Sequence, residues 1–199
     1  MNIIDFDSNW GKTQAAFVAL FARDGIPWEA YSQDQPDEHS LKIPVCLMIN
    51  RADGAVGFAG GKVEKNESLE AAAIRETQEE VGYKIDRKLI PVVAHDIGPI
   101  TTHLFALEMQ YNELREIQKN AVTAEHFGSE ITGVFLPHLI DYARLTRKDG
   151  GVSVLLRSAL AKSVREELAH FLLKMKIFDQ PQLKITCETA GYPLDKLLA

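Results

Sequence analysis

The sequence predicts an α/β fold in which helices pack on both faces of a mixed β-sheet. Short apolar segments rich in β-branched residues alternate with stretches of helical apolar spacing. Glycine, proline and aspartate separate these segments where turns are expected. The 199 residues are 46% apolar and 25% charged, which is ordinary for a globular protein. We therefore expect residues 1–199 to form one domain, with residues 177–199 as part of it or as an extension.

The first half of the chain is expected to supply two buried strands and a helix. Arg23-Asp24-Gly25 predicts a turn after the first strand. Ser68 is a plausible N-cap and Gly82 a plausible C-terminal glycine, so the helix is expected between them. The other expected elements are a strand at residues 15–22 (with a helix as the alternative), a loop at residues 28–40 and a strand at residues 43–50.

The second half is expected to alternate strands with helices and to end in an irregular tail. Apolar residues at helical spacing predict that the longest helix covers residues 153–176. Residues 177–199, with two prolines, are expected to be irregular or a short strand. The other expected elements are strands at residues 89–94, 101–107 and 130–136 and a helix at residues 111–122, with Leu114, Ile117 and Val122 on its apolar side.

Charge and targeting signals narrow the class of protein. The net charge of −6 argues against broad, charge-driven binding of nucleic acid. Cys46 and Cys187 are far apart and form no CxxC motif, so nothing requires an oxidising compartment. The N-terminus lacks the basic region of a secretory signal, and no apolar run reaches the roughly 18 residues that span a bilayer. We expect a soluble intracellular protein of the cytoplasm, or of the nucleus in a eukaryote, without membrane partners.

Three glutamates point to a metal site. Glu76, Glu79 and Glu80 lie at positions i, i+3 and i+4, so a helix places their carboxylates on one face. Such like charges repel unless a cation lies among them. A cluster of oxygen ligands suits Mg²⁺ or Mn²⁺ better than zinc. The glycine-rich residues 57–61 precede the helix and allow the backbone to approach a ligand closely. The alternative is a solvated acidic helix face.

Residues 61–83 resemble the Nudix box, G-x5-E-x7-R-E-U-x-E-E-x-G-U, in which U is a large aliphatic residue. Thr77 and Tyr83 depart from two of its aliphatic positions. Seven fixed positions in about twenty residues make the motif specific. The residues that match these positions are Gly61, Glu67, Arg75, Glu76, Glu79, Glu80 and Gly82.

The resemblance implies a Nudix-type α/β/α sandwich that hydrolyses phosphoanhydrides with divalent metal. Glu76, Glu79 and Glu80 would hold the ions with help from the carbonyl of Gly60. All three are candidate catalytic residues, and we expect Glu79 to take the proton of the attacking water. Glu67 and Arg75 would form a structural support pair that orients acidic side chains.

Segments outside the box are similar to the Nudix branch of the snoRNA-decapping enzymes, also known as inosine diphosphatases. This resemblance implies that the substrate is a purine nucleoside diphosphate or triphosphate, or the nucleotide-capped 5′ end of an RNA, and it suggests a homodimer. One alternative is hydrolysis of ADP-ribose or of a dinucleoside polyphosphate. Another is a catalytically silent module that binds RNA or protein, although the three crowded carboxylates argue against it.

The branch resemblance also marks residues outside the box. Arg51 and Phe58 match substrate-contacting positions, and Phe58 could equally be core. Glu167 falls where the branch has a base-reading glutamine, and Ala15 falls where it has a base-reading histidine. Both departures leave the preference for inosine open. His95, between a strand and a glycine turn, is a candidate metal ligand or an ordinary hydrogen-bonded histidine.

For the remaining polar residues we favour a position outside the site. Glu130 is a further acidic candidate for which we favour a solvated loop position, and His103 is expected to be structural. The short basic cluster Arg144, Arg147 and Lys148 could guide an RNA strand, but we favour a merely solvated loop.

Overall fold

The computed structural model describes residues 1–7, 11–27, 42–141 and 150–199. Within these residues, six strands form a sheet in the order β1-β7-β8-β2-β3, with β6 paired to β2, and β5-β4-β9 form a second sheet. The strands β2 and β8 run parallel and the other pairs are antiparallel, so the sheet is mixed as predicted. The strands are β1 (Asn2–Ile4), β2 (Thr13–Pro27), β3 (Lys42–Cys46), β4 (Met48–Arg51), β5 (Val56–Gly57), β6 (Ala59–Lys62), β7 (Ile90–Asp96), β8 (Ile100–Glu108) and β9 (Ile131–Phe135).

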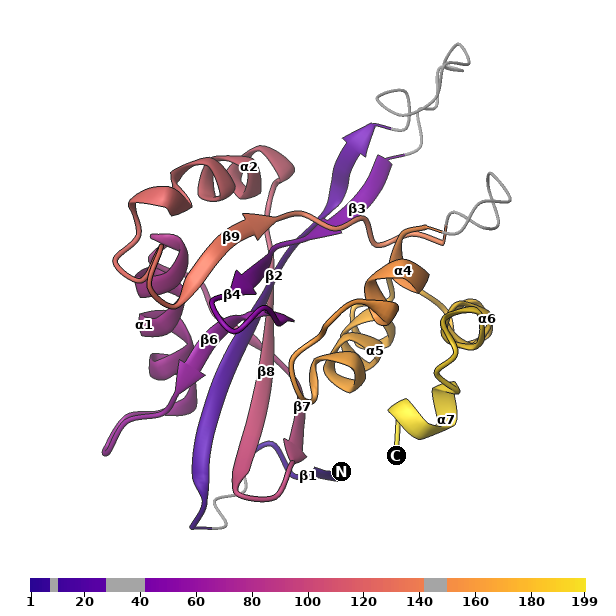
Figure 1. Cartoon of the computed structure of the whole chain (residues 1–199), viewed down its shortest axis with the longest axis horizontal. Coiled ribbons are helices and arrows are strands. Elements are labelled where there is room, and N and C mark those ends of the chain that lie inside the picture. Colours follow the sequence, from indigo (N-terminus) through magenta and orange to yellow (C-terminus); the bar gives the residue numbers. More distant parts are fainter. Residues whose placement is uncertain (8–10, 28–41, 142–149) are drawn as a thin grey trace.

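Helices cover both faces of the larger sheet, which confirms the α/β class (Figure 1). They are α1 (Leu69–Val81), α2 (Tyr111–Asn120), α4 (Val152–Arg157), α5 (Val164–Lys174), α6 (Gln180–Ala190) and α7 (Leu194–Leu197), with a 3₁₀ turn η2 (Ala121–Thr123) after α2. No helix in the described ranges is long and apolar enough to cross a membrane.

Strand β2 divides the core because its side chains alternate between the two faces of the sheet. Ala16, Val18 and Leu20 pack in the cluster that includes α1 and α2. Ala19 and Phe21 pack in the other cluster, with α4, α5, α6 and α7. The two clusters lie on opposite sides of the sheet, so each helical layer has its own apolar support.

Helix α1 has the ends that the sequence predicts. The hydroxyl of Ser68 accepts a hydrogen bond from the backbone N–H of Ala71, and Gly82 is left-handed with φ 72°. Positive φ favours glycine because it lacks a Cβ atom. The helix therefore presents the fixed glutamates in the predicted register, although Glu67 lies just before the helix and not within it.

The predicted turn at residues 23–25 is wrong, because β2 continues to Pro27. A Cβ atom on Gly25 would lie 2.0 Å from the carbonyl oxygen of Ile43. The glycine thus permits the close approach of β3 and does not mark a turn. The predicted strand at residues 43–50 is divided at Leu47 into β3 and β4, which belong to different sheets.

The predicted long helix at residues 153–176 is also wrong, because the chain forms α4 and α5 with an extended connection. The backbone N–H of Val56 donates to the carbonyl of Ala159, and the N–H of Ala161 donates to the carbonyl of Val56. These bonds to β5 compete with the helix. The apolar residues keep helical spacing between α4 and α5, so the sequence pattern does not reveal the break between these helices.

The tail predicted to be irregular is helical. Asp179 and Gln182 form a reciprocal capping box that starts α6, with Pro181 in the first turn, where proline is tolerated. Buried residues of α6 and α7 join the core on the α5 side. The predicted helix at residues 111–122 ends as α2 at Asn120, and Val122 is 62% exposed and not on the apolar side. The predicted loop at residues 28–40 lies outside the described residues.

Candidate active site

The side chains of Glu76, Glu79 and Glu80 lie in different environments. The carboxylate of Glu80 points to β6, where its Oε2 accepts a hydrogen bond of 2.8 Å from the backbone N–H of Gly60. Glu80 is only 4% exposed, and burial raises its pKa to about 8. Burial also raises the pKa of Glu76, against the opposing effect of Arg75. The helix face therefore holds carboxyl groups that are costly to ionise unless a cation lies nearby.

Two glycines of β6 allow this close approach. Gly60 has φ 143°, and a Cβ atom there would lie 2.3 Å from the carbonyl oxygen of Ala16. A Cβ atom on Gly61 would lie 2.5 Å from Cδ of Glu76. Only glycine fits these positions, because β6 is packed between β2 on one side and α1 on the other.

Arg75 holds the acidic side chains together. Its Nε and Nη2 donate to the two carboxylate oxygens of Glu67 at 3.0 and 3.1 Å, and its Nη1 donates to Glu76 and to Glu79, both at 2.9 Å. The hydrogen bonds from Arg75 lower the pKa of Glu67. The guanidinium is thus the positive charge among the carboxylates, and its planar fork suits this paired arrangement.

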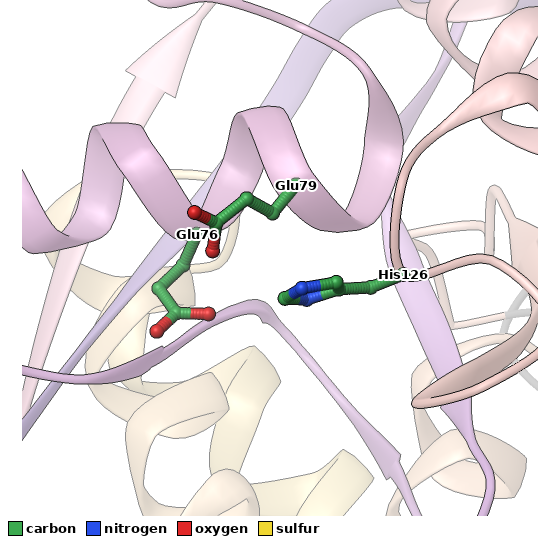
Figure 2. Close-up of side chains that lie close together, drawn as sticks. All are labelled: Glu76, Glu79 and His126. Atoms are coloured by element: carbon green, nitrogen blue, oxygen red, sulfur yellow. The ribbon is translucent and has the colours of Figure 1, made fainter.

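His126 completes the cluster and was not expected from the sequence. One oxygen each of Glu76 and Glu79 and one ring nitrogen of His126 lie within 4.8 Å of one another. Figure 2 shows the imidazole, from the loop after α2, pointing toward the two carboxylates. The backbone N–H of His126 donates to the carbonyl of Glu79 at 2.9 Å, which fixes this loop against the end of α1.

Two cavities share Arg51 and Asp53 in their linings, and the first of them lies beside Glu80. A cavity of about 280 Å³ is lined by Glu80, Glu130 and Arg51 among others. Arg51 is ion-paired with Asp53 at 2.9 Å, and both residues also line a second cavity of about 400 Å³. Arg51 therefore stands between the carboxylates of α1 and the second cavity, as a guanidinium placed to bind phosphate would.

Glu167 lines the second cavity, together with Ala15, Phe17 and Thr102. Its side chain is 1% exposed, and its Oε1 accepts hydrogen bonds from the hydroxyls of Thr102 at 2.7 Å and Ser163 at 2.9 Å. Burial raises the pKa of Glu167 to about 7, and the two hydroxyls oppose this shift. A buried carboxyl in a cavity is a common feature of functional sites.

Comparison with known proteins identifies the family. A model of the Nudt16-like family, described as U8 snoRNA-decapping enzyme-like, matches residues 31–178. The chain belongs to this family. The U8 snoRNA-decapping enzyme of Homalodisca vitripennis is 38% identical over 133 residues, which are 64% of this chain and 67% of that protein. The enzyme of Mus musculus is 29% identical over 157 residues, 72% of this chain and 78% of that protein. The protein is therefore a Nudix hydrolase, a pyrophosphohydrolase.

Solved structures show the same fold. A MutT/nudix family protein from Enterococcus faecalis has a TM-score of 0.55 at 14% identity, covering 97% of this chain and 79% of that chain. A mutT/nudix family protein from Listeria innocua has a TM-score of 0.53 at 19% identity, covering 83% and 94%. The Nudix-type sandwich that the box implied is thus confirmed.

In this Nudix hydrolase, His95 lies away from the helix-face carboxylates, which does not favour the metal ligand among its two predicted roles. Strands β2 and β8 lie between β6 and β7, which places the backbones of β6 and β7 about 14 Å apart. His95 is 1% exposed and packs beside His170 of α5, with ring centroids 5.5 Å apart. His95 lies near the end of β7, whereas His126 lies between η2 and β9. No local sequence pattern shows which of the two histidines reaches α1.

The remaining predicted residues fall in two groups. Phe58 lines the second cavity but is 2% exposed and packs against Phe171, so it is mainly a core residue, and the partly exposed Phe17 is the more accessible ring. His103 is fully buried against Phe6, in agreement with a structural role. Glu130 is exposed but lines the first cavity. The predicted basic cluster Arg144, Arg147 and Lys148 lies outside the described residues.

Proposed function

We propose that this Nudix hydrolase cleaves a phosphoanhydride bond in a purine nucleoside diphosphate or triphosphate, or at the nucleotide-capped 5′ end of an RNA, with Mg²⁺ or Mn²⁺. The observation that carries the proposal is the pair of cavities that share Arg51. The first cavity is lined by Glu80 of α1 and by Arg51, and Arg51 also lines the second cavity, which is lined by Glu167. This order of acidic, basic and hydrogen-bonding groups suits a metal, a phosphate chain and a base. The names of the related decapping enzymes support the choice of substrate.

The residues of the helix face fit a divalent cation. Oxygens of Glu76 and Glu79 and a nitrogen of His126 lie close enough to share one ion. Arg75 offsets only part of the charge of the two carboxylates, because its single positive charge is also shared with Glu67. A bound divalent ion would neutralise phosphate charge and lower the pKa of a water molecule. We propose Glu76, Glu79 and Glu80 as its main ligands, with the carbonyl of Gly60.

The protein's own groups then have distinct tasks. Glu79 takes the proton of the attacking water, because its side chain reaches the surface whereas Glu80 is buried against Gly60. Arg51, oriented by Asp53, binds the phosphate chain. Glu167 accepts a hydrogen bond from an N–H group of the base at the inner side of the cavity. Glu67 and Arg75 orient the acidic side chains without touching the substrate.

A substrate panel tests the proposal. GDP, IDP, ADP-ribose, a dinucleoside polyphosphate and capped RNA are incubated with the protein and Mg²⁺ or Mn²⁺, and the released phosphate and nucleoside monophosphate are measured. We expect hydrolysis of a purine nucleotide or of capped RNA. Preferential hydrolysis of ADP-ribose or of the dinucleoside polyphosphate would replace the proposed substrate. Inactivity on every compound would favour a silent module that binds RNA or protein.

The variant Glu80→Gln tests whether the activity in this panel comes from the helix face of α1. Glutamine keeps an oxygen that can accept the hydrogen bond from Gly60 but removes the negative charge. We expect kcat to fall by roughly 10²-fold or more while circular dichroism and the melting temperature stay close to the parent values. Near-normal turnover would mean that this helix face is not the catalytic site. The homodimer suggested by the resemblance stays a prediction, which light scattering can check.

A further inference from the structure

We propose that His126 is a nitrogen ligand of the metal site on α1 and makes that site favour Mn²⁺ over Mg²⁺. The inference rests on the proposed metal-dependent function and adds a residue and a metal preference to it. One ring nitrogen of His126 lies within 4.8 Å of oxygens of both Glu76 and Glu79. Figure 2 shows these three side chains converging from α1 and from the loop before β9.

The imidazole is available to a metal. Its Nδ1 is buried and has no hydrogen-bond partner in the part of the chain that the structure describes. The nearby carboxylate oxygen Oε1 of Glu130 lies 3.7 Å away, beyond the distance of a hydrogen bond. A buried ring nitrogen without a partner costs free energy, and binding of a cation at Nδ1 would remove that cost.

The loop holds His126 in place before any metal binds. The backbone N–H of His126 donates to Glu79 at 2.9 Å. Its carbonyl accepts from the backbone N–H of Glu130 at 3.0 Å and from the hydroxyl of Ser129 at 3.1 Å. Bonds on both sides of the residue fix the backbone, so the side chain is presented to α1 with little freedom. Such preorganisation is typical of a ligand and is unnecessary for a solvated histidine.

The donor atoms determine the preferred ion. Mg²⁺ binds oxygen ligands and water and holds its water shell tightly. Imidazole nitrogen is a poorer ligand for Mg²⁺ than for the transition-metal ion Mn²⁺. A site with one imidazole beside its carboxylate ligands therefore favours Mn²⁺ over Mg²⁺ more than a site made of oxygen alone does. His126 would therefore set the metal preference of a cluster whose carboxylates alone do not separate the two ions.

Electron spin echo spectroscopy of bound Mn²⁺ tests the ligand directly. We expect modulation from a ¹⁴N nucleus of a directly bound imidazole in the parent protein. The variant His126→Phe keeps a ring of similar size without nitrogen, and we expect the modulation to disappear. His138→Phe is the matched control, because His138 lies away from α1 in another cavity, and we expect the signal to remain. Mn²⁺ that binds without nitrogen coupling in the parent protein would overturn the inference.

Calorimetric titration with Mn²⁺ and with Mg²⁺ tests the preference. We expect the ratio of the Mg²⁺ to the Mn²⁺ dissociation constant to fall about tenfold or more in His126→Phe. In His126→Asp, which restores a ligand as oxygen, we expect Mg²⁺ binding to recover more than Mn²⁺ binding. Unchanged ratios would contradict the proposal. These measurements need no substrate, so the two proposals can fail separately. Nitrogen coupling without turnover would contradict only the proposed hydrolysis. Turnover without nitrogen coupling would contradict only the role of His126.

Discussion

The carboxylates of α1 and the carboxyl group of Glu167 are stabilised by different kinds of partner. Glu76 and Glu79 of α1 share the guanidinium of Arg75 with Glu67, which lies just before the helix. Glu167 is buried deeper, and no ion pair to it is present in the described residues. Two hydroxyls are its partners, and its pKa is raised to about 7. The first region has a cation beside its carboxyl groups, whereas the second has only neutral hydrogen-bond donors.

This difference assigns different chemistry to the two regions. Several carboxylate oxygens that converge beside an orienting guanidinium suit a site for a divalent metal ion. A buried carboxyl that is partly protonated near neutral pH suits selection of a neutral, hydrogen-bonding group such as a base edge. Glu80 lies between these cases, because it is buried like Glu167 but lies close enough to Arg51 for that charge to oppose its raised pKa.

Removal of Arg75 tests the part of the comparison with the largest expected effect. In Arg75→Gln the carboxylates lose the hydrogen bonds that orient them, and we expect this loss to outweigh the removal of a repelling charge, so that Mn²⁺ affinity falls by roughly 10- to 100-fold. Calorimetry measures the affinity, and circular dichroism checks the fold. Arg115→Gln is the control, because Arg115 lies on the exposed face of α2 and donates to Gln118. Equal affinity in the two variants would show that Arg75 has no role in the metal site.

Glu167→Gln tests the opposite region through the pH dependence of stability. The pKa of Glu167 is raised from 4.5 to about 7 in the folded protein, so between these values the folded state binds the proton more strongly than the unfolded state. Its contribution to stability is fully present below about pH 4.5 and is lost as pH rises through 7. The loss is roughly 3 kcal/mol at most. Glutamine does not titrate, so we expect this loss to be absent in the variant.

Urea unfolding at several pH values between 4.5 and 8 measures the effect as the difference between the variant and the parent. The difference is needed because the lowered pKa of His95, about 4, makes stability rise with pH over part of the same range. Glu116→Gln is the control, because Glu116 is an exposed glutamate of α2 and is not among the groups that shift the pKa of Glu167. Parallel stability curves for the parent and Glu167→Gln would show that Glu167 is not a protonated group in the fold.

The sequence predicted what depends on local spacing and missed what depends on distant contacts. The register of Glu76, Glu79 and Glu80 follows from α1 and its caps, so it could be predicted from the box. His126 reaches α1 through a backbone hydrogen bond to Glu79 between segments far apart in the chain, and no local pattern encodes that bond. The burial of Glu167 depends on the break between α4 and α5, which apolar periodicity concealed.

Thr102→Val has the smallest expected effect and tests how one hydrogen bond changes the pKa of Glu167. The hydroxyl of Thr102 donates to Oε1 of Glu167 at 2.7 Å and favours the ionised carboxylate. Valine has a similar shape without the hydroxyl, so we expect the pKa of Glu167 to rise further and the variant to lose about 2 kcal/mol of stability at pH 8. At pH 5 the carboxyl is largely protonated in both proteins, so the loss should be smaller. Thr101→Val is the control, because Thr101 is equally buried on the neighbouring position of β8 and makes no hydrogen bond to Glu167 in the described part of the chain. A loss that is the same at both pH values would mean that the hydroxyl acts through packing and leaves the charge of Glu167 to burial alone.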